Sequence, residues 1–214
     1  MSRKITLAEA LIRLRELEGK RVSDYVAPDL INKGSVGQAI EKAIGLDLSS
    51  DLLDFHDGEL KSNKFLNGQP AETLAITQVG HSLAEIMISV SWQNSMVRRK
   101  INSFIFLPIH KDSKNPMNWT IGKAVHFEEK KFPIEYEKLA KDFDSVSSQI
   151  RMAIQNGQNL HTFNGPYEYL QIRTKDSKRP NGNYNPVTYG DRQISDKNYA
   201  FYFRKGFLND ILSQ

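Results

Sequence analysis

The sequence predicts an α/β fold in which a mixed β-sheet is flanked by helices, and three observations indicate it. Apolar residues recur with the helical period over residues 7–17, 35–44 and 134–155. Short apolar segments typical of strands occur at residues 73–79, 104–109, 167–173 and 199–203. The segments follow one another as helix, sheet, helix and sheet, which is the organisation of an α/β domain.

The predicted helices carry signals at their ends. Thr6 is a suitable N-cap for the first helix, which ends near Gly19, and Gly157 follows the long third helix. In the second helix Glu41 projects beside the apolar face. A short helix after the last strand closes the chain.

The connecting segments are predicted from their turn residues. We expect a polar loop at residues 62–71 and an extended segment from Ile88 to Trp92. From Asp176 to Asn198 the chain is rich in Asn, Gly, Pro and Lys, so a long surface loop is expected there. Loops of this length are usually functional or disordered, and its tyrosines argue against disorder.

The bulk composition is that of a folded protein. With 39% hydrophobic and 25% charged residues, the 214 residues can form one large domain or two small ones. No apolar run approaches the ~20 residues of a membrane span, and the first residues lack an apolar signal stretch. The absence of cysteine excludes disulfides, thiolate nucleophiles and cysteine-ligated zinc. A cytoplasmic protein without membrane association is therefore expected.

Positive charge gathers towards the C-terminus, although the net charge is only +4. Beyond Tyr169 cationic residues alternate with tyrosines: Arg173, Lys175, Lys178, Arg179, Arg192, Lys197, Arg204 and Lys205, with Tyr184, Tyr189, Tyr199 and Tyr202. Cationic side chains neutralise phosphates, and planar ones can rest on sugars or bases. This composition predicts a lobe that faces DNA, although a solvated, lysine-rich surface would look the same.

The segment from Asp54 to Lys61 is the most informative in the chain. Asp57-Gly58 between apolar-containing segments is a strong signal for a two-residue hairpin turn. In such a hairpin Asp54, Glu59 and Lys61 would share one face, while Phe55 and Leu60 would point into the core. Two carboxylates and one ammonium group could bind a divalent metal ion and position a water molecule, as in a phosphodiester-cutting nuclease.

A simpler interpretation of this segment is an exposed ion pair. The Glu-x-Lys pattern also occurs at Glu18, Glu128 and Glu129, and most such copies are surface pairs. Only the copy at Glu59 combines a preceding acid, a turn and apolar alternate positions. His56 would share the face of the site, where it could bind metal or DNA, but a histidine in a turn is usually solvated.

Several motifs occur in a fixed order from Lys33 to the C-terminus. They are Lys33-Gly34-Ser35-Val36-Gly37 with Glu41, Asp54-Phe55 with Glu59-Leu60-Lys61, Pro70-Ala71-Glu72-Thr73, Trp92 to Lys100 before a strand ending in Pro108, Glu168 to Arg173 with Lys175, and Phe201-Tyr202 with Lys205 and Phe207. This series resembles the MutH family of DNA endonucleases, which includes mismatch-repair nicking enzymes and GATC-cutting restriction enzymes of the PD-(D/E)xK superfamily. The family's nicking enzyme has a longer connection between the Asp and the Glu-x-Lys.

The resemblance implies a restriction-endonuclease-like fold and a set of catalytic residues. A single domain spanning 1–214 is expected, with a catalytic lobe at about 1–130 and a DNA-recognition lobe at about 131–214. Asp54 and Glu59 would hold Mg²⁺, with Leu60 offering its backbone carbonyl. Lys61 would lie beside the attacking water and the phosphate, Glu41 would contact a water of the metal ion or a second metal ion, and Lys100 would contact phosphate. Asp57 replaces Asp54 as the metal ligand if the turn lies elsewhere.

The resemblance also implies residues that contact double-stranded DNA. Arg173 and Lys175 would read bases in the major groove, and Tyr202 would lie against the adenine amino group. Lys33 would meet a phosphate, and Arg204 and Lys205 belong to the cationic C-terminal set. Trp92 is expected in the core, and the alternative for Tyr202 is a strand tyrosine packed on the core.

Three functions remain open from the sequence. The first is a type II restriction endonuclease, suggested by a composition rich in Lys, Asn and Ile. The second is a mismatch-repair endonuclease that MutL activates to nick the unmethylated strand at hemimethylated GATC. The third is a DNA-binding module that does not cleave. A cognate DNA methyltransferase is the expected system partner of a restriction enzyme, and a palindromic site would suit a homodimer on DNA.

Overall fold

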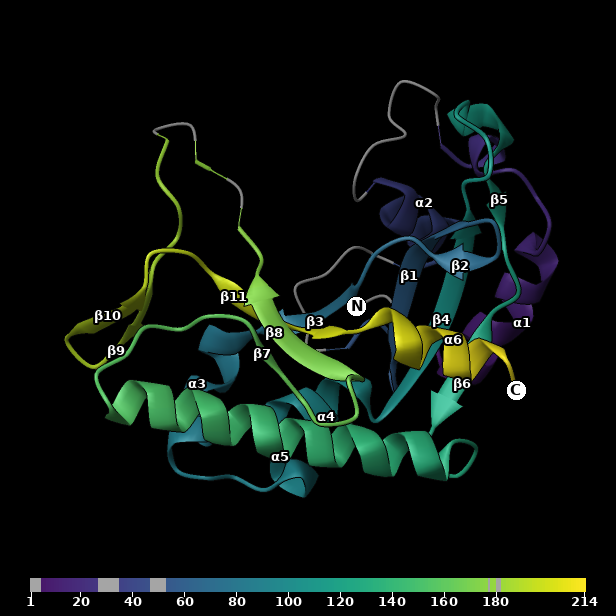
Figure 1. Cartoon of the computed structure of the whole chain (residues 1–214). Helices are drawn as coiled ribbons and strands as arrows, with labels where there is room; N and C mark the ends of the chain where they lie inside the picture. Colours follow the sequence, from purple (N-terminus) through teal and green to yellow (C-terminus); the bar gives the residue numbers. More distant parts are fainter. Residues whose placement is uncertain (1–4, 27–34, 47–52, 177, 180–181) are drawn as a thin grey trace. The chain divides into compact units, whose positions relative to one another are not determined.

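The structure is a computed structural model that describes residues 5–26, 35–46, 53–176, 178–179 and 182–214 (Figure 1). It divides into two compact units. Unit 1 comprises Met1–Glu72, Lys100–Phe132 and Ile211–Gln214, and unit 2 comprises Thr73–Arg99 and Pro133–Asp210. Parallel and antiparallel strands with flanking helices confirm the α/β class expected for a restriction-endonuclease-like fold.

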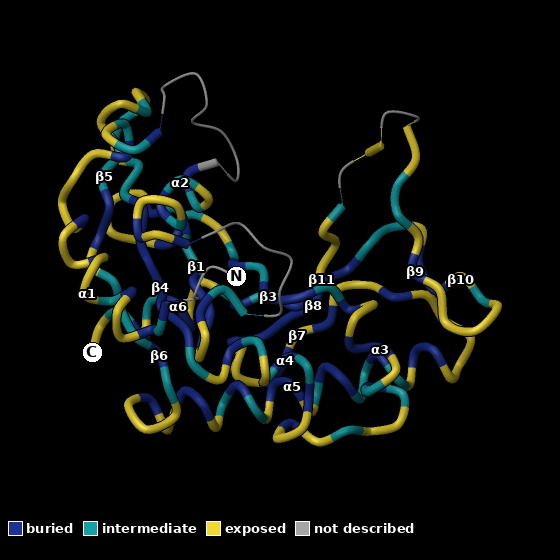
Figure 2. The backbone as a smooth tube through the Cα atoms, turned by 180° about the vertical axis from the view of Figure 1, so that it is seen from behind, coloured by how far each residue is buried: buried dark blue, intermediate teal, exposed yellow. Residues whose placement is uncertain are grey.

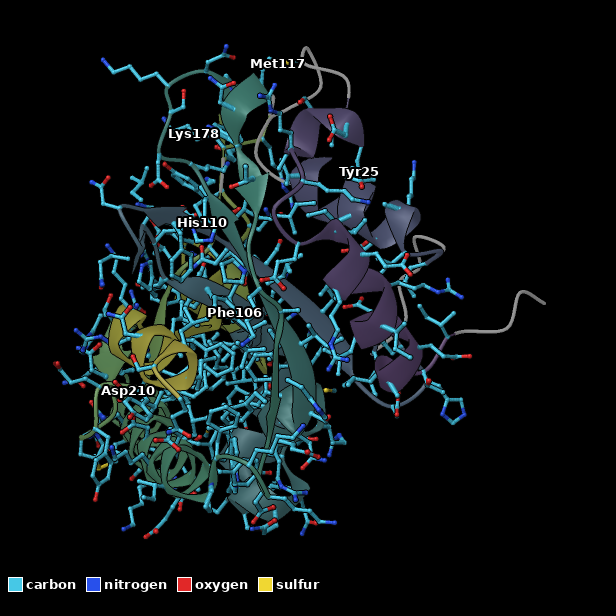
Figure 3. All side chains as sticks on the ribbon, turned by 90° about the vertical axis from the view of Figure 1, so that its right-hand side faces the viewer. Tyr25, Phe106, His110, Met117, Lys178 and Asp210 are labelled. Atoms are coloured by element: carbon cyan, nitrogen blue, oxygen red, sulfur yellow. The ribbon has the colours of Figure 1, made fainter. Side chains whose placement is uncertain are left out.

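Unit 1 contains a mixed five-stranded sheet in the order β2-β1-β4-β5, with β6 also paired to β4. The central strands β1 (Glu59–Leu66) and β4 (Ser103–His110) run parallel. Three short strands pair antiparallel with them: β2 (Gln69–Pro70), β5 (Thr120–Ile121) and β6 (Val125–Glu128). Figure 3 shows the labelled Phe106 and His110 along β4.

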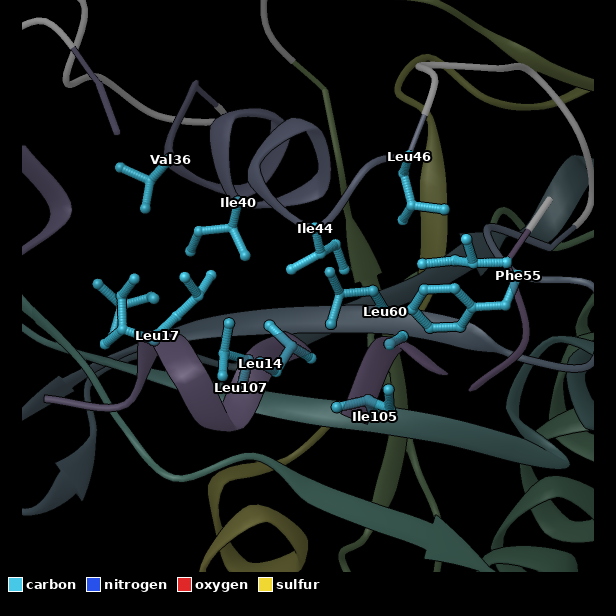
Figure 4. Packing of buried hydrophobic residues seen from close by; sticks show 14 of the residues in the cluster. Leu14, Leu17, Val36, Ile40, Ile44, Leu46, Phe55, Leu60, Ile105 and Leu107 are labelled. Atoms are coloured by element: carbon cyan, nitrogen blue, oxygen red, sulfur yellow. The ribbon is translucent and has the colours of Figure 1, made fainter. Parts of the chain in front are cut away.

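Helices α1 (Leu7–Leu17) and α2 (Ser35–Ala43) cover one face of this sheet. Thr6 forms the expected cap of α1, in a capping box with Glu9. Leu14 of α1 and Ile40 of α2 pack with Leu60, Phe55 and strand residues of β4 (Figure 4). Burial of these apolar faces is what holds the helices on the sheet. Two 3₁₀ turns, Val22–Asp24 and Pro116–Asn118, complete the unit.

Unit 2 contains an antiparallel four-stranded sheet in the order β3-β11-β8-β7. Its strands are β3 (Leu74–Gln78), β7 (Phe163–Asn164), β8 (Leu170–Thr174) and β11 (Tyr199–Phe203). The long helix α5 (Pro133–Gln155) packs on β7 and β8, and α3 (Val79–Met87) packs on β3, β11 and α5. Helices α4 (Met96–Ile101) and α6 (Lys205–Leu212) each contain a boundary between the units.

The expected hairpin at Asp57-Gly58 is wrong. Residues 54–57 form bends, and β1 begins at Glu59 and pairs with β4 and β2 instead of with the preceding segment. The backbone N–H of His56 donates to the Ile5 carbonyl at 3.1 Å, so this segment is bonded elsewhere. A Cβ at Gly58 would lie 2.8 Å from the Ser103 carbonyl oxygen, so glycine is needed here for close packing rather than for a hairpin turn.

Three other expectations were also wrong. Much of the loop expected at 62–71 is strand, because β1 continues to Leu66 and turns into β2. The segment from Ile88 to Trp92 is a turn after α3 that leads into a 3₁₀ turn, Trp92–Asn94, and Ser89 adopts a φ of 57° that an extended strand does not allow. The loop from 176 to 198 contains a hairpin of β9 (Val187–Tyr189) and β10 (Arg192–Ser195), whose tip is exposed (Figure 2).

The remaining helix and strand predictions are confirmed. The helices expected at 7–17, 35–44 and 134–155 correspond to α1, α2 and α5, and α6 closes the chain. Strands β3, β4 and β11 coincide with the predicted segments, while β8 begins later than expected, at Leu170. Within the described ranges, no helix combines the length and apolar character needed to cross a bilayer.

Candidate active site

Glu59 is the centre of a charged cluster in unit 1. It is only 2% exposed, at the first position of β1. Its Oε1 accepts hydrogen bonds from Lys61 Nζ at 2.5 Å and from Lys100 Nζ at 3.0 Å. Lys61 follows at the alternate position of the strand and therefore shares the face of Glu59, as predicted. Lys100 comes from α4.

Asp54 lies at the edge of β1. Its Oδ2 accepts a hydrogen bond from the Leu60 backbone N–H at 2.8 Å. The preceding loop is held by a bond from Phe55 N–H to the Gly58 carbonyl at 2.9 Å and by burial of the Phe55 ring, which is 1% exposed. The prediction that Phe55 and Leu60 enter the core together is confirmed, since both belong to one apolar cluster.

In the part of the chain that the structure describes, the outer edge of β1 is open beside this site. Among the described residues, β2 pairs only with Phe65 and Leu66, so no strand covers the first part of β1. The N–H and C=O of one strand residue project to the same edge. Because the Leu60 N–H is bonded to Asp54, the Leu60 carbonyl oxygen projects to the same open edge.

Glu41, on α2, belongs to the same electrostatic cluster. Burial and then the charge of Asp54 raise the pKa of Glu41, while Lys61 opposes the change. Burial and then the charge of Glu59 raise the pKa of Asp54. Glu59 therefore raises the pKa of both Asp54 and Glu41, and Asp54 raises that of Glu41. Carboxylates this close repel one another, and a bound cation would relieve that repulsion.

The oxygen atoms of this cluster suit a hard divalent cation. Glu59 Oε2 is buried without a hydrogen-bond partner among the described residues, and an orphaned carboxylate oxygen is costly unless a ligand meets it. Asp54 and the Leu60 carbonyl supply further oxygen atoms. The described residues include no group of three or more His, Cys, Asp or Glu side chains placed to hold a metal ion.

The alternative ligand Asp57 has a structural contact. Its Oδ1 accepts a hydrogen bond from Leu7 N–H at 2.7 Å, at the first turn of α1, where backbone N–H groups lack helical partners. His56 is exposed. Trp92 is 3% exposed, so its prediction as a core residue is confirmed. Lys33 lies outside the described residues.

Comparison with known proteins identifies the family. No family profile matches the chain. A DNA mismatch repair protein MutH from Haemophilus ducreyi is 31% identical over 202 residues, which cover 90% of this chain and 84% of the relative. The chain belongs to the MutH family. A MutH from Pasteurella multocida is 29% identical and is matched over 96% of its length by 98% of this chain. The type II restriction enzyme Sau3AI of Staphylococcus aureus is 28% identical over 94% of this chain but only 41% of that enzyme.

As a member of the MutH family, the chain is a DNA endonuclease, a hydrolase that acts on phosphodiester bonds. Its five predicted catalytic residues all lie in unit 1. Direct hydrogen bonds join Lys61 and Lys100 to Glu59, and electrostatic coupling joins Asp54 and Glu41 to them.

The DNA-reading residues expected in a MutH-family protein lie in unit 2. The Arg173 guanidinium lies 5.5 Å from the centre of the Tyr202 ring and donates to Thr73 Oγ1 at 3.2 Å. Lys175 and Lys205 are exposed. Arg204, at the start of α6, forms a 2.7 Å ion pair with Glu168.

One further residue of this face, Gln171, has no role predicted from the sequence motifs. Gln171 lies directly opposite Tyr202 in the β8–β11 pair, and two residues before Arg173, so it shares their side of the sheet. The signal available in the sequence was this two-residue spacing within the Glu168-to-Arg173 motif.

Proposed function

We propose that the chain is a Mg²⁺-dependent endonuclease that cuts double-stranded DNA at GATC and acts as a type II restriction enzyme. The grouping of Asp54, Glu59, Lys61 and Lys100 in one unit carries the proposal. It combines an acidic pair that suits a metal ion with two ammonium groups that suit an anionic substrate. We assign catalysis to the lobe at about 1–130 and DNA recognition to the lobe at about 131–214.

Phosphodiester hydrolysis adds negative charge to a centre that is already anionic. Asp54 and Glu59, with the Leu60 carbonyl, would hold Mg²⁺. When bound, this ion would neutralise phosphoryl oxygens and lower the pKa of a water molecule. The buried, unpartnered Glu59 Oε2 supports its role as a ligand.

The two lysines would act on the phosphate and on the attacking water. Both ammonium groups are largely buried, with side chains 14% and 17% exposed for Lys61 and Lys100, so water screens their charges only weakly. Lys61 would favour hydroxide over water and balance the developing charge, and Lys100 would contact the phosphate. Glu41 would help to place a water molecule or a second metal ion.

Recognition of the site would come from unit 2. Arg173 and Lys175 would read base edges, and Tyr202 would approach the adenine amino group, where N6-methylation would be sensed. Arg204 and Lys205, together with Lys33, would contact phosphates. The contact of Arg173 with both Tyr202 and Thr73 supports a preformed reading surface.

The second candidate function is a mismatch-repair endonuclease that nicks the unmethylated strand at hemimethylated GATC after activation by MutL. The observation that favours it is coverage: the relatives named MutH are matched over 84% and 96% of their lengths, and Sau3AI over 41%. The partner is MutL in this case, and a cognate DNA methyltransferase in the restriction case.

A supercoiled plasmid containing GATC separates the candidates. With Mg²⁺ alone, the proposal predicts linear DNA, whereas slow nicking accelerated by purified MutL would indicate the repair function. Gel retardation without any cutting would overturn both. Sizing the complex on a short palindromic duplex tests whether a homodimer binds DNA. We expect the enzyme to act on DNA in the cytoplasm.

A further inference from the structure

Unit 2 contains a pocket of about 390 Å³ at the start of α6. Arg204, Lys205 and Gly206 contribute one side of it, and Gln171 and Thr73 contribute the sheet side. Thr73 also accepts the hydrogen bond from Arg173, so the pocket adjoins the surface assigned to base reading. None of the catalytic residues lines this pocket.

Gln171 is the residue in this pocket that requires an explanation. Its side chain is buried, with 8% of the residue exposed, and no described residue forms a hydrogen bond with its amide group. The amide atoms are not among the fully buried, unpartnered side-chain atoms, so water can still reach them from the pocket. A ligand that accepts a hydrogen bond inside the pocket would replace that water.

The start of α6 adds positive potential to the same pocket. The first backbone N–H groups of a helix have no acceptor within the helix, and the helix dipole places partial positive charge there. A Cβ at Gly206 would meet no atom within 4 Å, so its backbone is open to approach. The Arg204 N–H is already used, since it donates to the Tyr169 carbonyl at 2.8 Å.

The formal charges at the pocket favour an anion. Arg204 and Lys205 carry two positive charges, and Glu168 carries one negative charge. The Glu168 carboxylate is paired with Arg204 Nη1 at 2.7 Å and is largely exposed, so it reduces the positive potential without filling the pocket. Anions with several acceptor oxygens, such as phosphates, suit backbone N–H groups at a helix N-terminus.

We propose that this pocket binds one phosphate of the DNA backbone, with the Gln171 amide as a donor and Arg204 and Lys205 supplying the charge. This inference rests on the proposed function, because it takes the substrate to be GATC-containing duplex DNA. A backbone phosphate is favoured over a base edge, because the Gln171 amide is recessed whereas the neighbouring Arg173 is exposed. The phosphate contact would fix the register in which Arg173 and Tyr202 meet the bases.

Methylphosphonate interference tests the proposal. Each phosphate of a GATC duplex is replaced in turn by a neutral methylphosphonate, and binding is measured without divalent ions so that no strand is cut. One position should weaken binding of the wild-type protein about tenfold or more. The same replacement should weaken DNA binding by the Gln171→Leu variant markedly less, because the variant has already lost the contact between the Gln171 amide and the phosphate. Lys205→Ala should lower the slope of log affinity against log salt by about 0.9.

Gln193→Leu, which changes an exposed glutamine on β10, is the matched control and should behave as wild type. If the wild-type protein neither binds nor cuts the duplex, the proposed function itself fails. If it binds and cuts, but every methylphosphonate weakens binding of wild type and Gln171→Leu equally, only the proposal of a phosphate pocket is overturned. Gln171→Leu could also lose discrimination between GATC and altered sites while every methylphosphonate weakens binding of the wild type and the variant equally. That result would show that Gln171 contacts a base and not a phosphate.

Discussion

Lys100 Nζ donates a hydrogen bond to Glu59 Oε1 over 3.0 Å, although the two residues lie 41 positions apart in the chain. The same oxygen accepts the bond from Lys61, two residues along β1. One carboxylate oxygen is thus neutralised by two ammonium groups, while the other, Oε2, has no partner among the described residues. This asymmetry leaves one oxygen of Glu59 for a cation.

Replacement of Lys61 should separate cutting from binding. Lys61→Ala should abolish cleavage but keep DNA affinity, because the ammonium group acts on the reacting phosphate and the water. Lys64→Ala is the matched control, since Lys64 alternates to the opposite face of β1 and pairs with Glu72 at 3.1 Å. Gel-shift and cleavage assays on the same duplex check both variants. Lost binding in a folded Lys61→Ala protein would contradict the assigned role.

Binding of Mg²⁺ should stabilise the folded protein through Asp54. At a concentration ten times the dissociation constant, a ligand specific to the folded state adds about 1.4 kcal/mol. Thermal unfolding with Mg²⁺ or EDTA should therefore show a rise in Tm for wild type and little or none for Asp54→Asn. Asp57→Asn should keep the Mg²⁺ effect, because Asp57 bonds to Leu7 N–H. The opposite pattern would make Asp57 the ligand.

The pH dependence of stability should include a contribution from Lys111. Burial, and then the charge of Lys64, lower the pKa of Lys111 to about 8 from its ordinary 10.5. Between these values the unfolded chain binds more protons than the folded chain, so stability should rise with pH over this window. The nearby Trp119 ring, 3.6 Å from Lys111 Nζ, favours the charged form and reduces the effect.

Lys111→Met should remove this pH dependence and stabilise the protein at pH 7 by about 1 kcal/mol. Urea unfolding at pH 7 and about pH 10 checks the difference between wild type and variant. Lys114→Met, at another lysine of unit 1, provides the comparison. A variant that is less stable at pH 7 would show that the contact of Lys111 with Trp119 outweighs the cost of burying the charge.

Asp142 should be essential for the stability of unit 2. It is fully buried, and its carboxylate accepts bonds from the N–H groups of Tyr167, Tyr169 and Leu170 at 2.7, 2.7 and 2.8 Å. Asp142→Ala leaves three donors without their acceptor and should cost about 3–5 kcal/mol. Asp144→Ala, on an exposed position of the same helix, should stay within about 0.5 kcal/mol. Equal losses in urea unfolding would refute this role.

Arg173 should contribute to sequence discrimination. Arg173→Ala should reduce the difference in binding free energy between GATC and singly altered sites by about 1–3 kcal/mol. The reason is that a guanidinium fork can pair with two acceptors of guanine. Lys141→Ala, which removes a solvent-exposed ion pair with Glu137 on α5, should leave the ratio unchanged. An equal loss of affinity for every DNA sequence would show that Arg173 contacts a phosphate and does not read a base.

Long periodic segments were predictable because packing follows the apolar pattern directly. The face of α1 at Leu7, Ala10, Leu14 and Leu17 is buried as its spacing predicts. The short helix α3 was missed, because its residues Val79–Met87 follow β3 without a break and carry neither an N-cap side chain nor a proline. Strand β2 is two residues long, too short to leave a periodic signal.

For the candidate site, the structure brings the predicted residues together by a different geometry from the expected hairpin. Glu59 and Lys61 share a face because they alternate on one strand, which needs no hairpin. Asp54 reaches them through a non-local arrangement: the segment before β1 bonds to Ile5 and to Leu7. Local turn statistics cannot reveal such tertiary bonds. The unpartnered amide of Gln171 likewise becomes visible only when burial and hydrogen bonds are known.

The most direct test is a plasmid digest by wild type and Glu59→Gln, with Mg²⁺ or EDTA, in which the cut ends are sequenced. Glu59→Gln keeps the size of the side chain but removes the charge that Lys61 and Lys100 neutralise. We expect cuts at GATC by wild type with Mg²⁺ alone, and no cuts by the variant or with EDTA. Equal cutting by Glu59→Gln, or cutting by wild type in EDTA, would contradict it.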